Sequence, residues 1–141
     1  MEQLTLFTMG YTGAPPTKAY HDDAGFDLAV DGNHTVRANQ FAQIPLQTRL
    51  LAPPGYWLLL VGRSSSFQRH GLLINVGVID PSYTGPLFAV CRNLTVHPVQ
   101  IAHGERLCQA IPIALADVPT TEFQQFPPTG RGENGFGSSG R

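Results

Sequence analysis

Residues 87–113 read LFAVCRNLTVHPVQIAHGERLCQAIPI and contain three apolar runs of strand length. The runs span Leu87–Asn93, Val96–Ala102 and Arg106–Ile113, and the turn sequence His103-Gly104-Glu105 separates the last two. Short apolar runs bounded by Gly, Pro, Asn and Asp residues are typical of β-strands joined by turns. This stretch predicts that the chain is built from short strands.

The same pattern extends toward the N-terminus, where apolar runs alternate with turn sequences such as Pro53-Pro54-Gly55. The 12 prolines and 15 glycines of the 141-residue chain leave little room for helices. Pro45 lies inside one run and indicates an edge strand or a bulge. A series of short strands is typical of a sandwich, a jelly roll or a barrel, so we expect an all-β fold. The further predicted strands are Leu4–Thr8, Phe26–Val30, Ala42–Leu51 and Tyr56–Val61.

One segment is predicted to be helical. Ser64-Ser65-Ser66 offers N-cap residues, and the segment that follows stops at Gly71 after His70. A helix that begins with serines can bind a phosphate, since its free backbone N–H groups and its dipole both favour an anion. A surface turn with ordinary capping serines fits this segment equally well.

The end of the chain cannot build a core. Residues 119–128 are bounded by prolines and predict a linker, and the glycine-rich residues 131–141 follow. Glycine, serine, arginine and one phenylalanine are the residue types of a flap that closes on a phosphorylated ligand. We predict a β domain over residues 1–118 and a linker with a glycine-rich arm over residues 119–141. A disordered polar tail is the alternative.

The composition excludes several classes of function. A net charge of −1 gives no electrostatic footprint for duplex nucleic acid or an acidic membrane, so any anion site must be local. No apolar run has the length of a membrane span, and no secretion signal is recognised. Cys91 and Cys108 lie in apolar runs without metal or redox spacing, which favours buried free thiols over a disulfide. We expect an intracellular protein, cytoplasmic or nuclear, that binds neither nucleic acid nor membrane directly.

Three carboxylates are notable for their positions. Asp27 interrupts an apolar run, Asp80 ends another, and Glu105 precedes Arg106 at the start of the last predicted strand. A carboxylate in or at the end of a strand needs a partner, so each can be a turn cap or a member of an ion pair. For Asp80 a cap and a catalytic base fit equally well. We interpret Glu105 as a structural residue that holds Arg106 or a backbone turn.

Five sequence blocks occur in a fixed order along the chain. The blocks are Ala24-Gly25-Phe26-Asp27-Leu28, Gly62-Arg63-Ser64-Ser65-Ser66, Gly77-Val78-Ile79-Asp80-Pro81-Ser82-Tyr83-Thr84-Gly85, Gly104-Glu105-Arg106-Leu107-Cys108-Gln109-Ala110-Ile111 and Arg131–Gly140. Together, in this order and spacing, they resemble the five motifs of the trimeric dUTP diphosphatase (dUTPase) family, which cover nearly the whole chain of its members and end in a glycine-rich arm.

The resemblance implies a distorted β jelly roll, the β-clip type of the dUTPase fold, with one short helix and a flexible C-terminal arm. It implies a homotrimer in which three subunits share each active site and the arm closes on a neighbouring subunit's site. The implied reaction is the hydrolysis of dUTP to dUMP and pyrophosphate by Mg²⁺-assisted attack of water on the α-phosphorus. This reaction limits uracil in DNA and supplies dUMP for dTMP synthesis.

The resemblance also implies roles for residues at the reacting phosphorus, the sugar and the base. Asp80 matches the general base that activates the water. Tyr83 matches the aromatic residue that packs against the deoxyribose and leaves no room for a 2′-hydroxyl. The hairpin through Asn75, Val76 and Gly77 matches the segment whose backbone reads the uracil edge.

The remaining matched positions surround the phosphates and the metal. Asp27 matches a position that contacts Mg²⁺ through water, and Gln109 matches a position in the same magnesium–triphosphate assembly. The phosphate-contacting block is matched by Arg63, Ser64 and Ser65. The matched arm residues are Arg131 for the terminal phosphate, Phe136 for stacking on uracil, and Gly137, Ser138 and Ser139 for the phosphate oxygens.

A few positions depart from the family pattern. Many relatives have proline before Arg63 and glycine after the first serine of that block, and glycine often replaces Asn75. Asn134 stands in place of a frequent arm glycine, and Ser139 in place of a frequent threonine. No reacting group is removed, so we expect an active enzyme. How the Ser65 block contacts phosphate and how the Asn75 segment contacts uracil are left open.

Three alternatives remain open. A dCTP deaminase shares the fold, but it needs a glutamate to activate water toward the base, where this chain has Gly77-Val78-Ile79-Asp80 followed by Tyr83. A nucleotide-binding regulatory module would keep the phosphate contacts without turnover, or an active enzyme would have a second role as a protein partner. A purely structural β-domain does not explain the polar residues that interrupt apolar strands at the family's positions.

Overall fold

The structure, a computed structural model, describes residues 8–137. Within these residues the chain forms eleven strands and one helix, and the strands pair in antiparallel fashion. No helix in this part of the chain is long and apolar enough to span a membrane. In chain order the elements are β1 (Gly10–Gly13), β2 (Phe26–Ala29), β3 (His34–Val36), β4 (Phe41–Pro45), β5 (Thr48–Leu51), β6 (Tyr56–Gly62), α1 (Ser64–His70), β7 (Leu72–Ile74), β8 (Gly77–Ile79), β9 (Phe88–Asn93), β10 (Val99–Ile101) and β11 (Arg106–Ala114).

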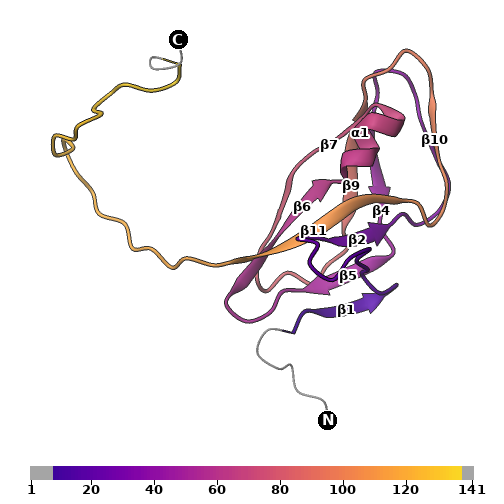
Figure 1. The fold of residues 1–141 in the computed structure, drawn as a ribbon, viewed down its shortest axis with the longest axis horizontal. Coiled ribbons are helices and arrows are strands. Elements are labelled where there is room, and N and C mark those ends of the chain that lie inside the picture. Colours follow the sequence, from indigo (N-terminus) through magenta and orange to yellow (C-terminus); the bar gives the residue numbers. More distant parts are fainter. Residues whose placement is uncertain (1–7, 138–141) are drawn as a thin grey trace.

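Two sheets and two smaller ribbons make up the body of the molecule (Figure 1). The larger sheet has the strand order β2-β11-β6-β8, the second has the order β4-β9-β7, and β1-β5 and β10-β3 form the ribbons. The long strand β11 lies between β2 and β6 and so links distant parts of the sequence. The all-β architecture with one short helix confirms the predicted fold class.

The core is formed by residues that face inward from successive strands. In β9 the buried residues Ala89, Cys91 and Asn93 alternate with more exposed ones, and Leu58 in β6 is fully buried. Alternation of this kind is expected when one face of a strand packs on the core and the other faces outward. The fully buried side chains with the largest volumes include Leu28, Ile44, Leu50, Leu72, Ile101 and Leu107.

The two cysteines are free and buried, as predicted. Burial raises the pKa of the Cys91 thiol, and burial together with the neighbouring Cys91 raises the pKa of Cys108 to about 12. At pH 8 only about one Cys108 side chain in ten thousand is then ionised, and the thiolate is the reactive form.

We therefore expect a disulfide-exchange reagent such as Ellman's reagent to leave the native protein unmodified at pH 8 and to titrate both thiols after unfolding. The absorbance of the released thiolate, followed with and without denaturant, measures this. Rapid, stoichiometric reaction of the native protein would contradict the burial of the two thiols.

Two of the predicted strands need correction. Ala42–Leu51 was expected to be one strand but forms β4 and β5, because residues 46 and 47 turn the chain so that the Leu46 N–H donates to Leu87 and the Gln47 N–H to Ala29. Pro45 ends β4 at the edge of its sheet, which confirms the edge position. The run Val96–Ala102 shortens to β10.

The shortening of Val96–Ala102 has a local cause. Asn93 is buried, and its side-chain oxygen accepts hydrogen bonds from the Thr95 backbone N–H (2.8 Å) and hydroxyl (2.7 Å). Its amide donates to the His97 carbonyl at 2.7 Å. These bonds bend residues 94–98 into a turn, and the strand begins only at Val99.

Four observed strands were not predicted, and one predicted strand cannot be compared. The unpredicted strands β1, β3, β7 and β8 are each three or four residues long. Of the predicted strand Leu4–Thr8, all but Thr8 lies outside the described residues.

The predicted helix is confirmed at its C-terminal end, but it begins earlier than predicted. Helix α1 spans Ser64–His70, and Gly71 has the left-handed conformation (φ 67°, ψ 25°) that ends a helix. The N-cap residue is Arg63, which has an extended backbone and makes no side-chain capping hydrogen bond. The prediction that the serines cap the helix was therefore wrong. Because Ser64 is already helical, Ser66 faces the sheet instead, where its hydroxyl donates to the Leu107 carbonyl at 2.8 Å.

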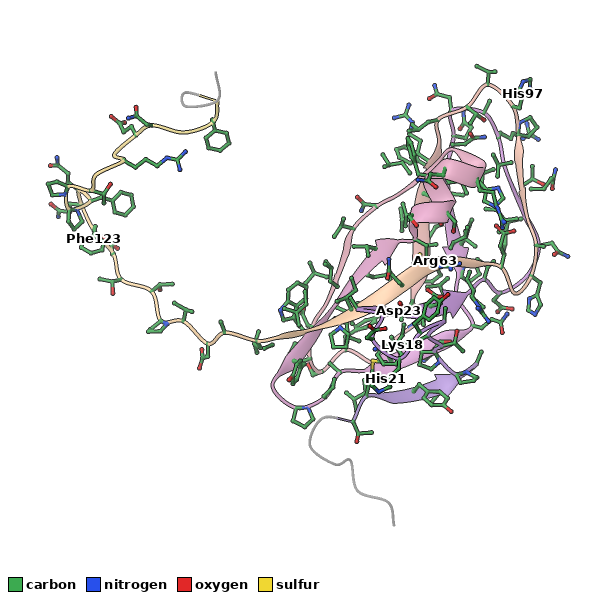
Figure 2. All side chains as sticks on the ribbon, viewed as in Figure 1. Lys18, His21, Asp23, Arg63, His97 and Phe123 are labelled. Carbon is green, nitrogen blue, oxygen red and sulfur yellow. The ribbon has the colours of Figure 1, made fainter. Side chains whose placement is uncertain are left out.

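After β11 the chain leaves the body of the molecule (Figure 1). The Leu115 N–H still donates to the Gly55 carbonyl at 2.9 Å, and residues 116–137 form no helix or strand. Phe123, labelled in Figure 2, lies on this segment at a distance from the sheets and packs with Phe126 at a ring-centroid separation of 5.9 Å. The division into residues 1–118 and 119–141 stays a prediction.

Candidate active site

The first group of site residues is centred on an ion pair between the first two sequence blocks. Asp27 in β2 and Arg63, just after β6, are joined by a contact of 3.0 Å between Asp27 Oδ1 and Arg63 Nε. The Asp27 side chain is only 12% exposed, so water screens this pair less than a surface pair. The interpretation of Asp27 as a strand carboxylate that needs a partner is therefore confirmed.

Gln109 in β11 lies beside this pair, because it is directly opposite Asp27 in the β2–β11 register. Its side-chain amide donates to the Gly62 carbonyl at 3.3 Å, next to Arg63. Arg63 in turn donates from its guanidinium to the Arg106 carbonyl at 3.2 Å. The three side chains are thus held in one place by β2, β6 and β11.

A polar cleft of about 270 Å³ opens next to this group. It contains three arginines and two serine side chains against a single carboxylate, so it favours an anion with several oxygens. Ser65 lines it, whereas Ser64 is exposed and does not line it. The lining side chains include Arg63, Ser65, Ser66, Arg69, His70, Glu105 and Arg106.

Glu105 closes one side of the cleft. Its carboxylate lies 2.5 Å from His70 Nε2 at the end of α1, and its other oxygen accepts a hydrogen bond of 3.4 Å from the Ala102 N–H. Glu105 is thus a structural residue on a backbone turn, as interpreted, but its side-chain partner is His70 and not Arg106. The contact ties α1 to the turn before β11.

The second group is the turn that follows β8. Asp80 is exposed, and its carboxylate makes no hydrogen bond or ion pair with another described residue. The Tyr83 N–H donates to the Asp80 carbonyl at 3.1 Å, which closes a turn, and the Tyr83 hydroxyl donates to the Pro86 carbonyl at 2.7 Å. Both residues line a pocket of about 250 Å³ with Val78, Ile79, Pro86, Leu87, Phe88 and Val90. One turn therefore fixes the positions of the carboxylate and the aromatic ring.

Part of the hairpin before β8 is hydrogen-bonded to other strands of the chain. The Asn75 N–H donates to the Val90 carbonyl at 2.7 Å, so this donor is occupied within the chain. Gly77 lies opposite Leu60 in the β6–β8 pair. Asn75 and Val76 are exposed, and the carboxamide of Asn75 makes no hydrogen bond to another described residue. If this hairpin contacts a nucleobase, the contacts would come from the Asn75 side chain and from the backbone at Val76.

The third group is the arm, which lies apart from the other two. Arg131 donates from Nε to the Asn134 carbonyl at 2.5 Å, a local contact within the arm. Phe136 is completely exposed and Gly137 follows it with a positive φ of 95°. The predicted residues Ser138 and Ser139 lie outside the described residues.

The three groups do not meet within one chain. In the β6–β8 pair Ile79 lies opposite Leu58, so Asp80 follows near the start of β6, whereas Arg63 comes directly after its end. The antiparallel register places Asp80 beside Trp57, and the six steps along the chain from Trp57 to Arg63 span about 20 Å at 3.3 Å per residue. A carboxylate and a guanidinium this far apart cannot contact the same phosphate.

Sequence reasoning missed three contributors to these groups. Arg69 on α1 and Arg106 at the start of β11 line the polar cleft, but isolated arginines carry no signal for an anion site. A side chain on the buried Gly25 would lie 2.3 Å from Gln109 Oε1, so the glycine leaves room for that amide. The block that contains Gly25 was recognised, but its role depends on a partner more than eighty residues away.

Comparison with known proteins gives one consistent result. The sequence model of the dUTPase family matches residues 12–140. A deoxyuridine 5′-triphosphate nucleotidohydrolase of Pasteurella multocida is 34% identical over 131 residues, which cover 89% of this chain and 87% of that protein. The Pol polyprotein of equine infectious anemia virus (strain Wyoming) is 30% identical over 132 residues, but the chain spans only 11% of that polyprotein.

Solved structures agree at the level of the fold. The dUTPase of Staphylococcus bacteriophage 80alpha with dUPNHPP has a TM-score of 0.87 and 23% identity, and the match covers 95% of this chain and 99% of that one. A mutant dUTPase of S. aureus phage phi11, described with a structural Mg(II) ion, has a TM-score of 0.79 and 20% identity over 86% of this chain and 99% of that one. The predicted jelly-roll-like fold is confirmed by this likeness.

The family model covers most of the chain, and the Pasteurella enzyme is similar along nearly the full length of both proteins. The residues matched by the family model include the ordered blocks that carry Asp27, Arg63, Asp80, Gln109 and Arg131. This chain belongs to the dUTPase family, the deoxyuridine 5′-triphosphate nucleotidohydrolases.

Proposed function

We propose that this chain hydrolyses dUTP to dUMP and pyrophosphate by attack of water on the α-phosphorus, and that it thereby limits uracil in DNA and supplies dUMP for dTMP synthesis. The observation that carries the proposal is the turn after β8, which holds an unpaired carboxylate, Asp80, beside a partly exposed tyrosine ring, Tyr83. A hydrolase of this kind needs a base and a sugar-packing surface at a fixed separation.

Asp80 is the proposed general base. Its side chain is exposed and makes no hydrogen bond to another described residue, so a water molecule can reach the carboxylate. It accepts a proton from the water whose oxygen forms the new bond to the α-phosphorus, while the bond to the bridging oxygen of the pyrophosphate breaks. The attacking and leaving oxygens lie in line, so the positions of base and phosphates determine the rate.

Arg63, Ser64 and Ser65 are proposed to contact the phosphates. Arg63 and Ser65 line the polar cleft beside α1, and Ser64 is exposed outside it. The Asp27 carboxylate holds Arg63 at 3.0 Å, which fixes the direction of the guanidinium before substrate arrives. Gln109 lies opposite Asp27 and completes this side of the site.

Mg²⁺ is the proposed cofactor. It prefers oxygen ligands, keeps several waters, and usually binds through one or two carboxylates and substrate phosphates. Among the described residues no group of three or more His, Cys, Asp or Glu side chains could hold a metal ion alone. One Asp27 oxygen pairs with Arg63 and the other makes no hydrogen bond to a described residue, so Asp27 fits a hydrated ion held mainly by the substrate. Such an ion, when bound, neutralises phosphate charge.

Base and sugar selection are assigned to the third sequence block and the hairpin before it. Tyr83 packs against the deoxyribose, and the segment Asn75 to Gly77 reads the uracil edge. Because the Asn75 N–H is already bonded to Val90, the Asn75 carboxamide and the backbone at Val76 are the expected contacts. A site with donors and acceptors suited to uracil rejects cytosine, since the wrong partner leaves buried groups unpaired.

A homotrimer with shared active sites is the proposed assembly. The separation of about 20 Å between the Asp80 turn and Arg63 means that a second subunit must supply one of them. The arm residues Arg131, Phe136, Gly137, Ser138 and Ser139 then come from a third. An exposed apolar face supports subunit contacts: Leu73, Val76 and Val78 are each more than half exposed, and Phe41 is 77% exposed.

The substrate assignment predicts that dUTP is cleaved well, while UTP, dCTP and dTTP are cleaved poorly, and that a chelator lowers the rate. Pyrophosphate release measured for the four nucleotides, with Mg²⁺ and with EDTA, tests this. Ammonia release from dCTP would indicate a deaminase. Tight binding of dUTP without turnover would indicate a regulatory relative, and either result would overturn the proposed reaction.

A further inference from the structure

Gly85 lies two residues after Tyr83, and the ring of Tyr83 occupies the space that a side chain at position 85 would need. A Cβ atom built on Gly85 would lie 2.5 Å from Tyr83 Oη, 2.6 Å from Cζ and 3.0 Å from Cε1. Separations below 3.0 Å are not tolerated between carbon atoms, so an alanine at position 85 and the present position of the ring exclude each other.

The ring is held over this glycine by its own turn. The Tyr83 hydroxyl donates to the Pro86 carbonyl at 2.7 Å, and its backbone N–H donates to the Asp80 carbonyl at 3.1 Å. The ring is therefore folded back across residues 85 and 86 with 43% of the residue still exposed toward solvent. Its exposed face is the surface that a sugar would contact.

Gly85 is not required for the conformation of the backbone. It is absent from the glycines with positive φ, which include Gly55, Gly71 and Gly104. Alanine can adopt the backbone of Gly85, so the need for glycine comes from space alone. The atoms in the way belong to a side chain that can rotate, so a methyl group at position 85 would move the Tyr83 ring and leave the fold intact.

We propose that Gly85 is a positioning residue that sets the place of the Tyr83 ring and, through it, the discrimination between 2′-deoxyribose and ribose. This inference rests on the proposed function, in which the ring leaves no room for a 2′-hydroxyl. With alanine at position 85 the ring loses the hydrogen bond to Pro86 and swings away from the turn. The displaced ring then leaves space where the 2′-hydroxyl of UTP would lie.

The test is the Gly85→Ala variant, with kcat/KM measured for dUTP and for UTP. The ratio of the two values is expected to fall by about 10- to 100-fold, mainly through a higher KM for dUTP and an unchanged or higher value for UTP. Ala116→Val is the control, because it also adds methyl groups but at an exposed position after the last strand and outside the proposed site, and its ratio should equal that of the wild type. Circular dichroism and thermal unfolding establish that both variants are folded.

A double-mutant cycle separates positioning of the ring from a general effect on the turn. In a Tyr83→Ala background the ring is absent, so Gly85→Ala should change the dUTP/UTP ratio no further. Calorimetric binding of non-hydrolysable imido analogues of dUTP and UTP gives the same comparison without turnover. It therefore stays decisive if the wild type binds dUTP and fails to hydrolyse it.

Two results would overturn the inference. One is a Gly85→Ala enzyme that is folded and discriminates as well as the wild type. The other is an effect of Gly85→Ala that is fully additive to that of Tyr83→Ala, which would show that position 85 acts through something other than the ring. Failure of the wild type to bind either nucleotide would instead contradict the proposed function.

Discussion

Asp80→Asn is expected to lower kcat for dUTP by about 10²- to 10⁴-fold while the affinity for dUTP stays nearly unchanged. An amide has almost the shape of the carboxylate but cannot accept the proton of the attacking water. The Asp80 side chain is exposed and makes no hydrogen bond to another described residue, so the substitution should not alter the fold. Pyrophosphate release gives kcat, and calorimetry with a non-hydrolysable analogue gives the affinity.

Asp117→Asn serves as the control for this experiment. Asp117 is also exposed and lies after the last strand, so its replacement removes the same charge without touching the proposed site. The control should retain wild-type kcat. If Asp80→Asn keeps more than about a tenth of wild-type kcat, Asp80 is not the general base.

Deletion of residues 131–141 is expected to lower kcat/KM for dUTP by about 10²- to 10³-fold. The arm is proposed to supply the Arg131 charge, the Phe136 ring and several hydrogen-bond donors, and loss of one preorganised donor alone has an effect of this size. Steady-state kinetics with and without the deletion measure the loss.

The deletion should leave the fold and its thermal stability unchanged. Among the described residues, Arg131 and Gly132 form hydrogen bonds only with Asn134 and Thr129, which both lie after the last strand, and Phe136 is fully exposed. Unfolding followed by circular dichroism should therefore give the wild-type midpoint. Full activity of the deleted protein would contradict a catalytic role for the arm, whereas a lower midpoint would show that the arm also supports the body.

The sequence predicted the longer strands and the helix because their signals are local. Strands β6, β9 and β11 are apolar runs of six to nine residues, and Gly71 marks the end of α1. The short strands β3 and β8 could not be predicted in this way. Each has three residues and exists because a distant strand pairs with it, β10 in one case and β6 in the other.

Errors in the prediction also have physical causes. The serines of α1 were expected to cap the helix, but the helix begins one residue earlier than a cap at Ser64 would allow, and the buried Ser66 bonds to β11. The strand expected over Val96–Ala102 is shortened by the side chain of Asn93, which binds the backbone of the following turn. Side-chain hydrogen bonds of this kind do not change the hydrophobic periodicity of the sequence, so the pattern does not predict them.

For the site, the residue types came from the sequence and the resemblance, and the contacts came from the structure. Asp27 was expected to need a partner, but only the fold identifies Arg63 as that partner. The sequence also could not predict the hydrogen bond that occupies the Asn75 N–H or the lack of space above Gly85. Both depend on how neighbouring segments pack.

Subunit complementation tests the shared active site most directly. Asp80→Asn chains retain the arm, and chains without residues 131–141 retain the base, so neither protein alone should be active. After the two are unfolded, mixed in equal amounts and refolded together, sites that draw base and arm from different subunits should restore about a quarter of wild-type activity. No recovery in a mixture shown to contain mixed trimers would mean that one chain supplies both groups, and the shared site proposed here would be wrong.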